Sequence, residues 1–305
     1  MMSLPNLVIG GAPKCGTSSI SSWLADHPQA CGSKVKETFY LMDEGHPLRH
    51  RDSNYQQHGL DGYRQYFENS SADQRIIFEA TTHYLYQQTA LEVLASLDPM
   101  PQIVFVLRKP SERVYSSFQY SKNNLANVRR ELTFSRFVDE LGKTSDSTML
   151  REYARESAFV LSNDIKYSRY IEYLTTWVER FGTERVHVLL FEDMKRDPRG
   201  FMQTLARRID IDPRFYDNYN FQAKNETVNL KYLSLHRGAR KLNGVIPRSG
   251  LRNALKSVYL KAQARESRNG RSAADRQSLN ELDRHFQPFN RRLAKELSLD
   301  LAVWD

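Results

Sequence analysis

The stretch "LVIGGAPKCGTSSISSWLADHP", residues 7–28, combines a glycine-rich turn, a lysine and a run of hydroxyl side chains between an apolar run and a helical pattern. This arrangement suits an anion, because glycines let the backbone approach closely and the N–H groups that begin a helix carry partial positive charge. Lys14 adds a mobile point charge, and Thr17 and Ser18 add donors. Ordinary helix capping explains the glycines and hydroxyls but not a lysine inside the turn. The pattern therefore predicts a phosphate-binding loop.

The parts of a metal-dependent kinase are missing around this loop. A P-loop kinase places its lysine directly after the second glycine and holds Mg²⁺ with an aspartate at the end of a second strand. Here Lys14 comes before Gly16, and the strand-like run "QIVFVLR" ends in Arg108. A cation at this point favours an anion site over a metal site. We therefore expect a nucleotide used without a metal, and an ATP-dependent P-loop kinase is the less favoured alternative.

The elements that would position these residues alternate along the chain. Apolar, β-rich runs predict buried strands at 4–11, 75–80, 102–108 and 185–193. Helical patterns lie at 17–26, 62–68, 84–97, 111–128, 163–181 and 198–209. This alternation predicts an α/β fold in which helices cover both faces of a central parallel sheet.

The remainder of the chain shows no further strand of this type. Residues 213–305 are expected to form loop and helix packed on a single domain that spans 1–305. The polar stretches 41–60 and 140–160 are expected to be loops over the open edge of the sheet, where ligands bind in such folds.

Length and composition favour a globular protein. The chain has 305 residues, of which 40% are hydrophobic, and no run approaches the about 18 apolar residues of a membrane helix. Cys15 and Cys31 have neither the number for a disulfide framework nor the spacing of a zinc site. We expect a cytoplasmic protein without an integral membrane segment, or the soluble part of a larger one.

The positive charge is concentrated in one segment. The whole chain carries +8, whereas residues 224–271 hold twelve basic and two acidic residues, a net charge of +10. A basic face of this kind favours an anionic partner such as a phosphorylated cofactor, an acidic polysaccharide, nucleic acid or a membrane surface. A solvated helical face is the plain alternative.

Five motifs together resemble a known family. In chain order they are "PKCGTSS", "VKETFYL", "FEATTHYLY", "VLRKPSERVYSSF" and "LLFEDMKRDP". They resemble the sulfotransferases that use 3′-phosphoadenosine-5′-phosphosulfate (PAPS), nearest to the carbohydrate type with the heparan sulfate N- and O-sulfotransferases and their bacterial relatives. The similarity covers residues 4–210 and returns at 279–297. It implies a three-layer α/β/α fold like that of P-loop NTPases, PAPS as donor, 3′-phosphoadenosine 5′-phosphate (PAP) as product, and no metal.

The resemblance also implies how the nucleotide is held. Lys14 would touch the bridge between phosphate and sulfate and stabilise the leaving phosphate. Arg108 and Ser116 would bind the 3′-phosphate, which suits the planar fork of an arginine and a hydroxyl near a helix start. The 5′-phosphate would be held by the four residues after the lysine: Cys15, Gly16, Thr17 and Ser18.

A general base is needed to take the proton of the acceptor. Glu37 in "VKETFYL" matches the glutamate base of the family, although a glutamate beside Lys36 also suits a plain surface ion pair. Relatives often have a histidine where this chain has Phe39, and their Glu-Lys-Thr motif appears here as residues 79–81 without its lysine. His83 is therefore an alternative base, and a structural histidine is the other reading of that residue.

Two further features of the family have no clear counterpart. The late Lys-Gly-Arg loop that contacts the nucleotide has no clean copy, and its candidates are Lys224, Lys231 and Arg237. Tyrosine and phenylalanine side chains between residues 63 and 86 suit either stacking on an acceptor or the core.

We expect a sulfotransferase that acts on a hydroxyl or amine of a carbohydrate. A small lipid or natural-product alcohol is the second choice for the acceptor. Nucleic acid is not expected as a partner, and the sequence does not assign an oligomeric state.

Overall fold

The computed structural model describes residues 4–71, 73–125, 128, 131–141, 155–222 and 271–305. Two compact units are present. The first consists of Met1–Arg113, Tyr167–Asn225 and Phe286–Asp305, and the second of Val114–Lys166 and Glu226–His285. The single domain expected from the sequence stays a prediction.

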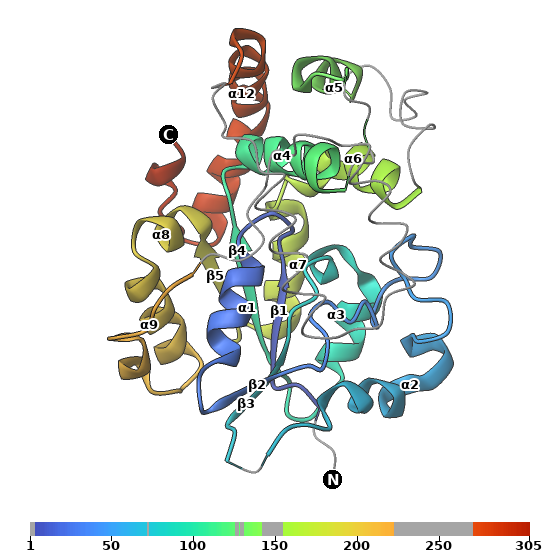
Figure 1. Cartoon of the computed structure of the whole chain (residues 1–305), viewed down its shortest axis with the longest axis vertical. Helices are drawn as coiled ribbons and strands as arrows, with labels where there is room; N and C mark the ends of the chain where they lie inside the picture. The colour runs from blue at the N-terminus through green and yellow to red at the C-terminus, as the bar shows by residue number, and fades with distance from the viewer. Residues whose placement is uncertain (1–3, 72, 126–127, 129–130, 142–154, 223–270) are drawn as a thin grey trace, which may run out of the picture. The chain divides into compact units, whose positions relative to one another are not determined.

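The first unit is built on a five-stranded parallel sheet (Figure 1). Its strands lie in the order β2-β3-β1-β4-β5, which places β1 at the centre. All four pairings are parallel. The strands are β1 (Leu7–Gly11), β2 (Ala30–Gly32), β3 (Ile76–Glu79), β4 (Gln102–Leu107) and β5 (Val186–Leu190).

Helices and short helical turns connect the strands and continue after them. In chain order they are α1 (Thr17–Ala25), α2 (Tyr55–Arg64), η1 (Gln65–Phe67), η2 (Tyr84–Tyr86), α3 (Gln88–Ala95), α4 (Pro110–Gln119), η3 (Tyr120–Asn124), α5 (Phe134–Leu141), α6 (Arg155–Tyr167), α7 (Ile171–Phe181), α8 (Phe191–Arg196), α9 (Pro198–Arg208), η5 (Pro213–Tyr216), α12 (Ala273–Glu296) and η6 (Ala302–Trp304).

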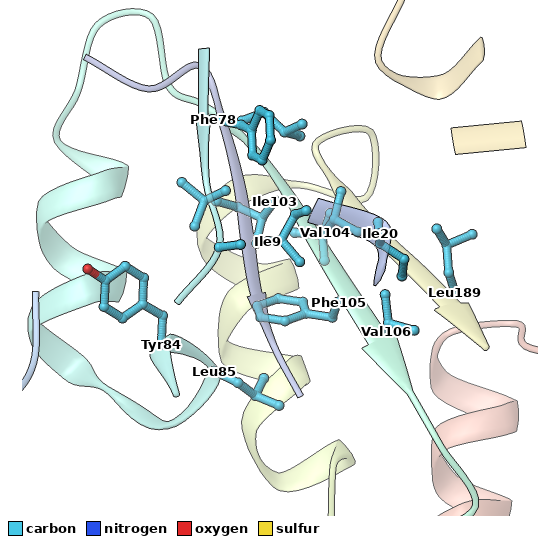
Figure 2. Close-up of a cluster of buried hydrophobic side chains, with 14 of the residues drawn as sticks. Ile9, Ile20, Phe78, Tyr84, Leu85, Ile103, Val104, Phe105, Val106 and Leu189 are labelled. Atoms are coloured by element: carbon cyan, nitrogen blue, oxygen red, sulfur yellow. The ribbon is translucent and has the colours of Figure 1, made fainter. Parts of the chain in front are cut away.

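The core lies on both faces of the sheet, which explains the continuous apolar runs. Successive strand residues point to opposite faces. On one face Phe105 of β4 packs against Trp177 of α7, with 5.2 Å between the ring centroids. On the other, Val104 and Val106 lie on the side of Ile20 of α1 (Figure 2). Helices therefore cover both faces, and the predicted three-layer α/β/α fold is confirmed.

Local signals explain where several helices begin. Asp197 caps α9, since its side chain accepts from the N–H of Gly200 at 2.9 Å. Asn54 caps α2 in the same way, accepting from the N–H of Gln57 at 3.1 Å. This cap starts α2 inside the stretch 41–60, so the prediction of a loop was wrong for its end.

The four predicted strands are confirmed, although the last ends at Leu190 and α8 begins at Phe191, where the prediction continued the strand to residue 193. The helix α5 was not predicted. The short strand β2 was not predicted. The helix predicted at 163–181 is two helices, because the chain breaks between Tyr167 and Ile171. Of the stretch 140–160, residues 142–154 lie outside the described part. The prediction of a loop was wrong at both ends, because α5 continues to Leu141 and α6 begins at Arg155.

The C-terminal segment contains α12 and η6 in its described part, with a non-helical connection between them. The basic segment 224–271 lies outside the described residues except for Arg271. Within the described ranges, none of the helices has the length and apolar character needed to cross a membrane.

Candidate active site

Three neighbouring strands end at one edge of the sheet. The register pairs Ile9 of β1 with Val104 of β4, and Val8 of β1 with Glu79 of β3. Because parallel strands place their carboxyl ends at the same edge, the loop after β1 lies between Arg108, which follows β4, and the turn after β3. The sheet therefore gathers the predicted site residues from separate parts of the sequence.

The loop after β1 leads directly into the N-terminus of α1. Gly16 has φ 80°, and a Cβ placed on it would lie 2.5 Å from Met194 Cε and 2.9 Å from Phe191 Cδ2 of α8. A side chain is excluded here both by the backbone conformation and by α8. Lys14 adopts a left-handed conformation as well, with φ 70°. This geometry points the first N–H groups of a helix toward the edge of the sheet.

Cys15 is buried beneath this loop. Its Sγ lies 3.9 Å from Tyr170 Oη, and the side chain is fully shielded from solvent. Burial raises the pKa of the thiol to about 11, although Arg113 and Arg108 act to lower it. The thiol is therefore neutral, and the backbone N–H is the group that Cys15 has to offer a phosphate.

Arg108 contacts the loop itself. Its Nη1 donates to the carbonyl oxygen of Lys14 at 3.4 Å, and its Nη2 lies 3.4 Å from Glu112 Oε2. The guanidinium carbon lies 4.8 Å from the ring centroid of Phe191, a cation–π contact. The side chain keeps 19% exposure. Arg108 and Lys14, which were predicted to bind opposite ends of one nucleotide, are thus neighbours through the Lys14 backbone.

A second layer of contacts holds the turn after β4. Tyr170 Oη donates to the carbonyl oxygen of Arg108 at 2.9 Å. Glu192 accepts from the N–H of Lys109 at 3.0 Å and from the indole N–H of Trp304 at 2.9 Å. The sequence analysis assigned no role to these residues. The sequence offered one signal for them, Glu192, which is the first acid of the stretch "LLFEDMKRDP".

Glu37 lies beside the turn after β3. Its Oε1 accepts from Thr82 Oγ1 at 2.7 Å and lies 3.3 Å from Lys36 Nζ. Burial acts to raise the pKa of Glu37, but Lys36, the Thr82 hydrogen bond and His83 outweigh it, and the pKa is lowered. The ion pair with Lys36 therefore exists. The Thr82 hydroxyl also holds this carboxylate, and the Glu37 side chain keeps 31% exposure.

His83 lies close to Glu37 but is more buried, with 7% exposure. Burial lowers the pKa of His83 to about 4, against the opposing effect of Glu37. Nδ1 has no hydrogen-bond partner among the described residues. At neutral pH the imidazole is therefore uncharged and has a lone pair to accept a proton.

The positive charge of Arg113 acts on titratable groups in both parts of the site. The residue is 1% exposed, and its Nε donates to Ser168 Oγ at 2.8 Å. Its charge acts on the pKa of Cys15 under the loop and on that of His83. Ser168 lies in the break between α6 and α7, so this break places the hydroxyl that binds Arg113. Arg113 was not predicted as a site residue.

The other predicted residues are placed less completely. Thr17 is buried and Ser18 half-buried in the first turn of α1. Ser116 lies in α4 within the second unit, so its pairing with Arg108 stays a prediction. The three candidates for the late nucleotide contact lie outside the described residues: Lys224, Lys231 and Arg237.

Most of the aromatic candidates for an acceptor surface belong to the core. Tyr63, Phe67 and Tyr84 have at most 1% exposure. In the part of the chain that the structure describes, no group of three or more His, Cys, Asp or Glu side chains is placed to hold a metal ion.

Comparison with known proteins agrees with this geometry. A family model described as the sulfotransferase domain matches residues 4–242. The chain belongs to the sulfotransferase family. The identification made from the five motifs is therefore confirmed.

The sulfotransferase is similar to much longer proteins. It is 24% identical over 217 residues to "Bifunctional heparan sulfate N-deacetylase/N-sulfotransferase 1" of Caenorhabditis briggsae, and 26% identical over 225 residues to the protein of the same name from Caenorhabditis elegans. The alignments cover 70% and 71% of this chain but 23% of each relative. The chain thus spans less than a quarter of their length.

A solved structure shares the fold over the whole chain. The sulfotransferase from Alicyclobacillus acidocaldarius superposes with a TM-score of 0.65 at 19% identity, covering 99% of both chains. Two proteins with so few identical residues share the architecture, which agrees with the P-loop-like α/β fold predicted above.

Proposed function

We propose that this sulfotransferase moves a sulfuryl group from PAPS to a hydroxyl or amine of a carbohydrate. The contact between Arg108 and the Lys14 carbonyl oxygen, at 3.4 Å, carries the proposal. It places the Arg108 guanidinium against the backbone of the loop that carries Lys14 and leads into the N-terminus of α1, which suits a nucleoside with two phosphate groups. Family membership supports the same donor.

The loop and the turn after β4 would share the nucleotide. Gly16, Thr17 and Ser18 at the start of α1 would hold the 5′-phosphate, with the backbone N–H of Cys15. Arg108 would bind the 3′-phosphate, assisted by Ser116. Arginine suits this task because its fork of donors matches a phosphate.

Chemistry would follow at the other end of the donor. Glu37 would take the proton from the acceptor while its oxygen or nitrogen forms the new bond to sulfur. The bond between sulfur and the bridging phosphate oxygen breaks, and the ammonium of Lys14 would meet the charge that grows on that oxygen. The lowered pKa of Glu37 keeps this carboxylate ionised at neutral pH, and Thr82 fixes its orientation. His83 is the second candidate for the base.

A carbohydrate is the preferred acceptor because the two Caenorhabditis relatives are named for heparan sulfate. The relatives are much longer, so their acceptor serves here as the first substrate to try. Chemically desulfated heparin is a suitable probe, and a panel of small lipid and natural-product alcohols covers the second choice. The cytoplasmic location expected from the sequence stays a prediction.

Isothermal titration calorimetry tests the nucleotide site directly. PAP should bind, whereas ATP with Mg²⁺ and duplex DNA should bind far more weakly. Arg108→Ala should weaken PAP binding by about 10- to 100-fold, because a charge-assisted hydrogen bond is lost, and should affect adenosine 5′-phosphosulfate far less. Arg196→Ala, an exposed arginine of α8, is the matched control. Equal loss of affinity for both nucleotides would refute the role of Arg108, and tight ATP binding would favour a kinase.

The base is tested by turnover. Glu37→Gln should lower the rate of sulfuryl transfer from PAPS to desulfated heparin at least about 100-fold, to a small residual rate, while PAP binding survives. Full activity of Glu37→Gln together with an inactive His83→Gln would move the base to His83.

A further inference from the structure

The segment that carries Glu37 has an unusual backbone. Glu37 has φ 62° and Phe39 has φ 49°, so two residues with side chains adopt left-handed conformations on either side of Thr38. Each such residue costs about 1 kcal/mol or more relative to ordinary backbone. A conformation of this kind persists only where the surrounding contacts hold it.

Thr38 is the centre of these contacts. It is fully buried, and its Oγ1 donates to Glu79 Oε2 at 2.6 Å. The same oxygen lies 3.1 Å from Tyr84 Oη and accepts from the N–H of Tyr40 at 3.3 Å. One hydroxyl therefore joins the segment to the end of β3 and to η2.

Three further bonds join the two segments in parallel. Tyr84 Oη accepts from the N–H of Leu41 at 3.1 Å, and Thr81 Oγ1 accepts from the N–H of Phe39 at 3.4 Å. Thr82 Oγ1 donates to the carboxylate of Glu37. Residues 79–84 thus form hydrogen bonds with the segment 37–41 along its length.

Glu79 is the rigid end of this arrangement. It is the last residue of β3, lies in register with Val8 of β1, and has no exposed surface. Among the described residues its Oε1 makes no hydrogen bond of good geometry, although the hydroxyl groups of Tyr63 and Tyr84 lie near enough to act on the pKa of the carboxyl group. A buried carboxyl group with an unsatisfied oxygen costs stability. Its bond to Thr38 is a contact for which a leucine of similar size could not substitute.

We propose that Glu79 is a positioning residue that fixes Glu37 through Thr38. The inference rests on the proposed role of Glu37 as base. Because Glu79 has no exposed surface, it would reach neither the donor nor the acceptor. Glu79 accepts the hydrogen bond from the Thr38 hydroxyl, and this bond stabilises the left-handed backbone at Glu37 and Phe39. That backbone conformation in turn sets the direction of the Glu37 carboxylate.

Paired substitutions separate this role from packing. Thr38→Val removes the hydroxyl at nearly constant volume, and Thr38→Ser keeps it. Glu79→Leu removes the acceptor, and Glu79→Gln keeps one. Thr175→Val is the matched control, since the Thr175 hydroxyl donates to the Ile171 carbonyl oxygen inside α7.

The first measurement is the rate of PAP release from PAPS, with desulfated heparin or water as acceptor. Thr38→Val and Glu79→Leu should lower kcat about 10- to 100-fold, as expected for a base displaced by about an ångström. The affinity for PAP should stay unchanged. Thr38→Ser and Glu79→Gln should recover most of the rate, and Thr175→Val should leave it unaltered.

The second measurement is a double-mutant cycle with Glu37→Gln. If Thr38 acts through Glu37, Thr38→Val should cost little in the background where the base is already absent. A role in packing alone would lower the residual rate by the same factor in both backgrounds, and this result would overturn the inference.

The failure of the inference differs from failure of the proposed function. Wild-type rates in Glu37→Gln would reject the base itself. An inactive Glu37→Gln together with fully active Thr38→Val and Glu79→Leu would keep the base and reject the positioning role. Hydrogen exchange of residues 37–41 needs no acceptor, and it should accelerate in Thr38→Val and Glu79→Leu but not in Thr38→Ser. Unaltered exchange would also reject the inference.

Discussion

Two buried titratable groups in the first unit should act on stability with opposite dependence on pH. Burial lowers the pKa of His83 from 6.5 to about 4. Below pH 6.5 this histidine binds a proton in the unfolded chain but stays neutral in the folded protein. The free energy of unfolding therefore falls as the pH falls toward 4. Burial raises the pKa of Glu79 from 4.5 to about 7. Above pH 4.5 the folded protein keeps a proton that the unfolded chain releases, so stability falls as the pH rises toward 7.

The two effects have nearly the same size. Each pKa unit corresponds to about 1.4 kcal/mol, so either group changes the free energy of unfolding by about 3 kcal/mol across its window. The windows overlap between pH 4.5 and 6.5, where the two slopes cancel. The contributions of these two groups to the wild-type pH profile should therefore almost cancel, and removing one group should expose the slope of the other.

Glu79→Gln should lose about 3 kcal/mol of stability between pH 6.5 and 4, and His83→Gln should lose a similar amount between pH 4.5 and 7. The double variant should return to a profile parallel to that of the wild-type protein, because both opposing contributions are removed. Urea unfolding at a series of pH values, followed by tryptophan fluorescence, measures this. All three tryptophans lie in the first unit and are buried, so the signal reports the unit that holds both groups. A Glu79→Gln profile parallel to that of the wild type would refute the reasoning.

Three other predictions concern the loop and the turn after β4. Gly16→Ala should abolish PAP binding in calorimetry, because a Cβ there meets α8 at positive φ; unchanged affinity would contradict the geometry. Cys15 should resist a thiol reagent in the native protein, because it is buried and its pKa is raised to about 11, so Cys31→Ser should remove the fast-reacting thiol. Trp304→Phe removes a donor to Glu192 and should weaken PAP binding about threefold to tenfold, and an unaltered dissociation constant would show that the turn holds without it.

Residues that signal their role locally could be predicted from the sequence. The strand, turn and helix around Lys14 follow one another without interruption, and Arg108 ends a strand with a charge that a core strand would not otherwise carry. The three-residue β2 is too short for a pattern and exists because β3 pairs with it. The break after α6 has no glycine or proline to announce it.

Other residues act across long separations, and sequence patterns do not show them. Glu192 and Trp304 are 112 residues apart, and Thr38 and Glu79 are 41 residues apart. Thr38 reads as an ordinary member of a motif until the backbone on either side of it is known. Glu79 was noted for the lysine that is missing after it, whereas its buried contacts are the informative feature.

The carboxylate of Glu192 divides its two oxygens between the backbone of Lys109 and the indole of Trp304. We therefore expect nucleotide binding at Arg108 and docking of residues 301–305 to be thermodynamically linked, and by reciprocity each would change the equilibrium of the other by the same factor. A fusion partner attached after Asp305 would compete with this docking and weaken nucleotide affinity without approaching the pocket. The emission of Trp304 in turn offers an intrinsic reporter of whether that pocket is filled.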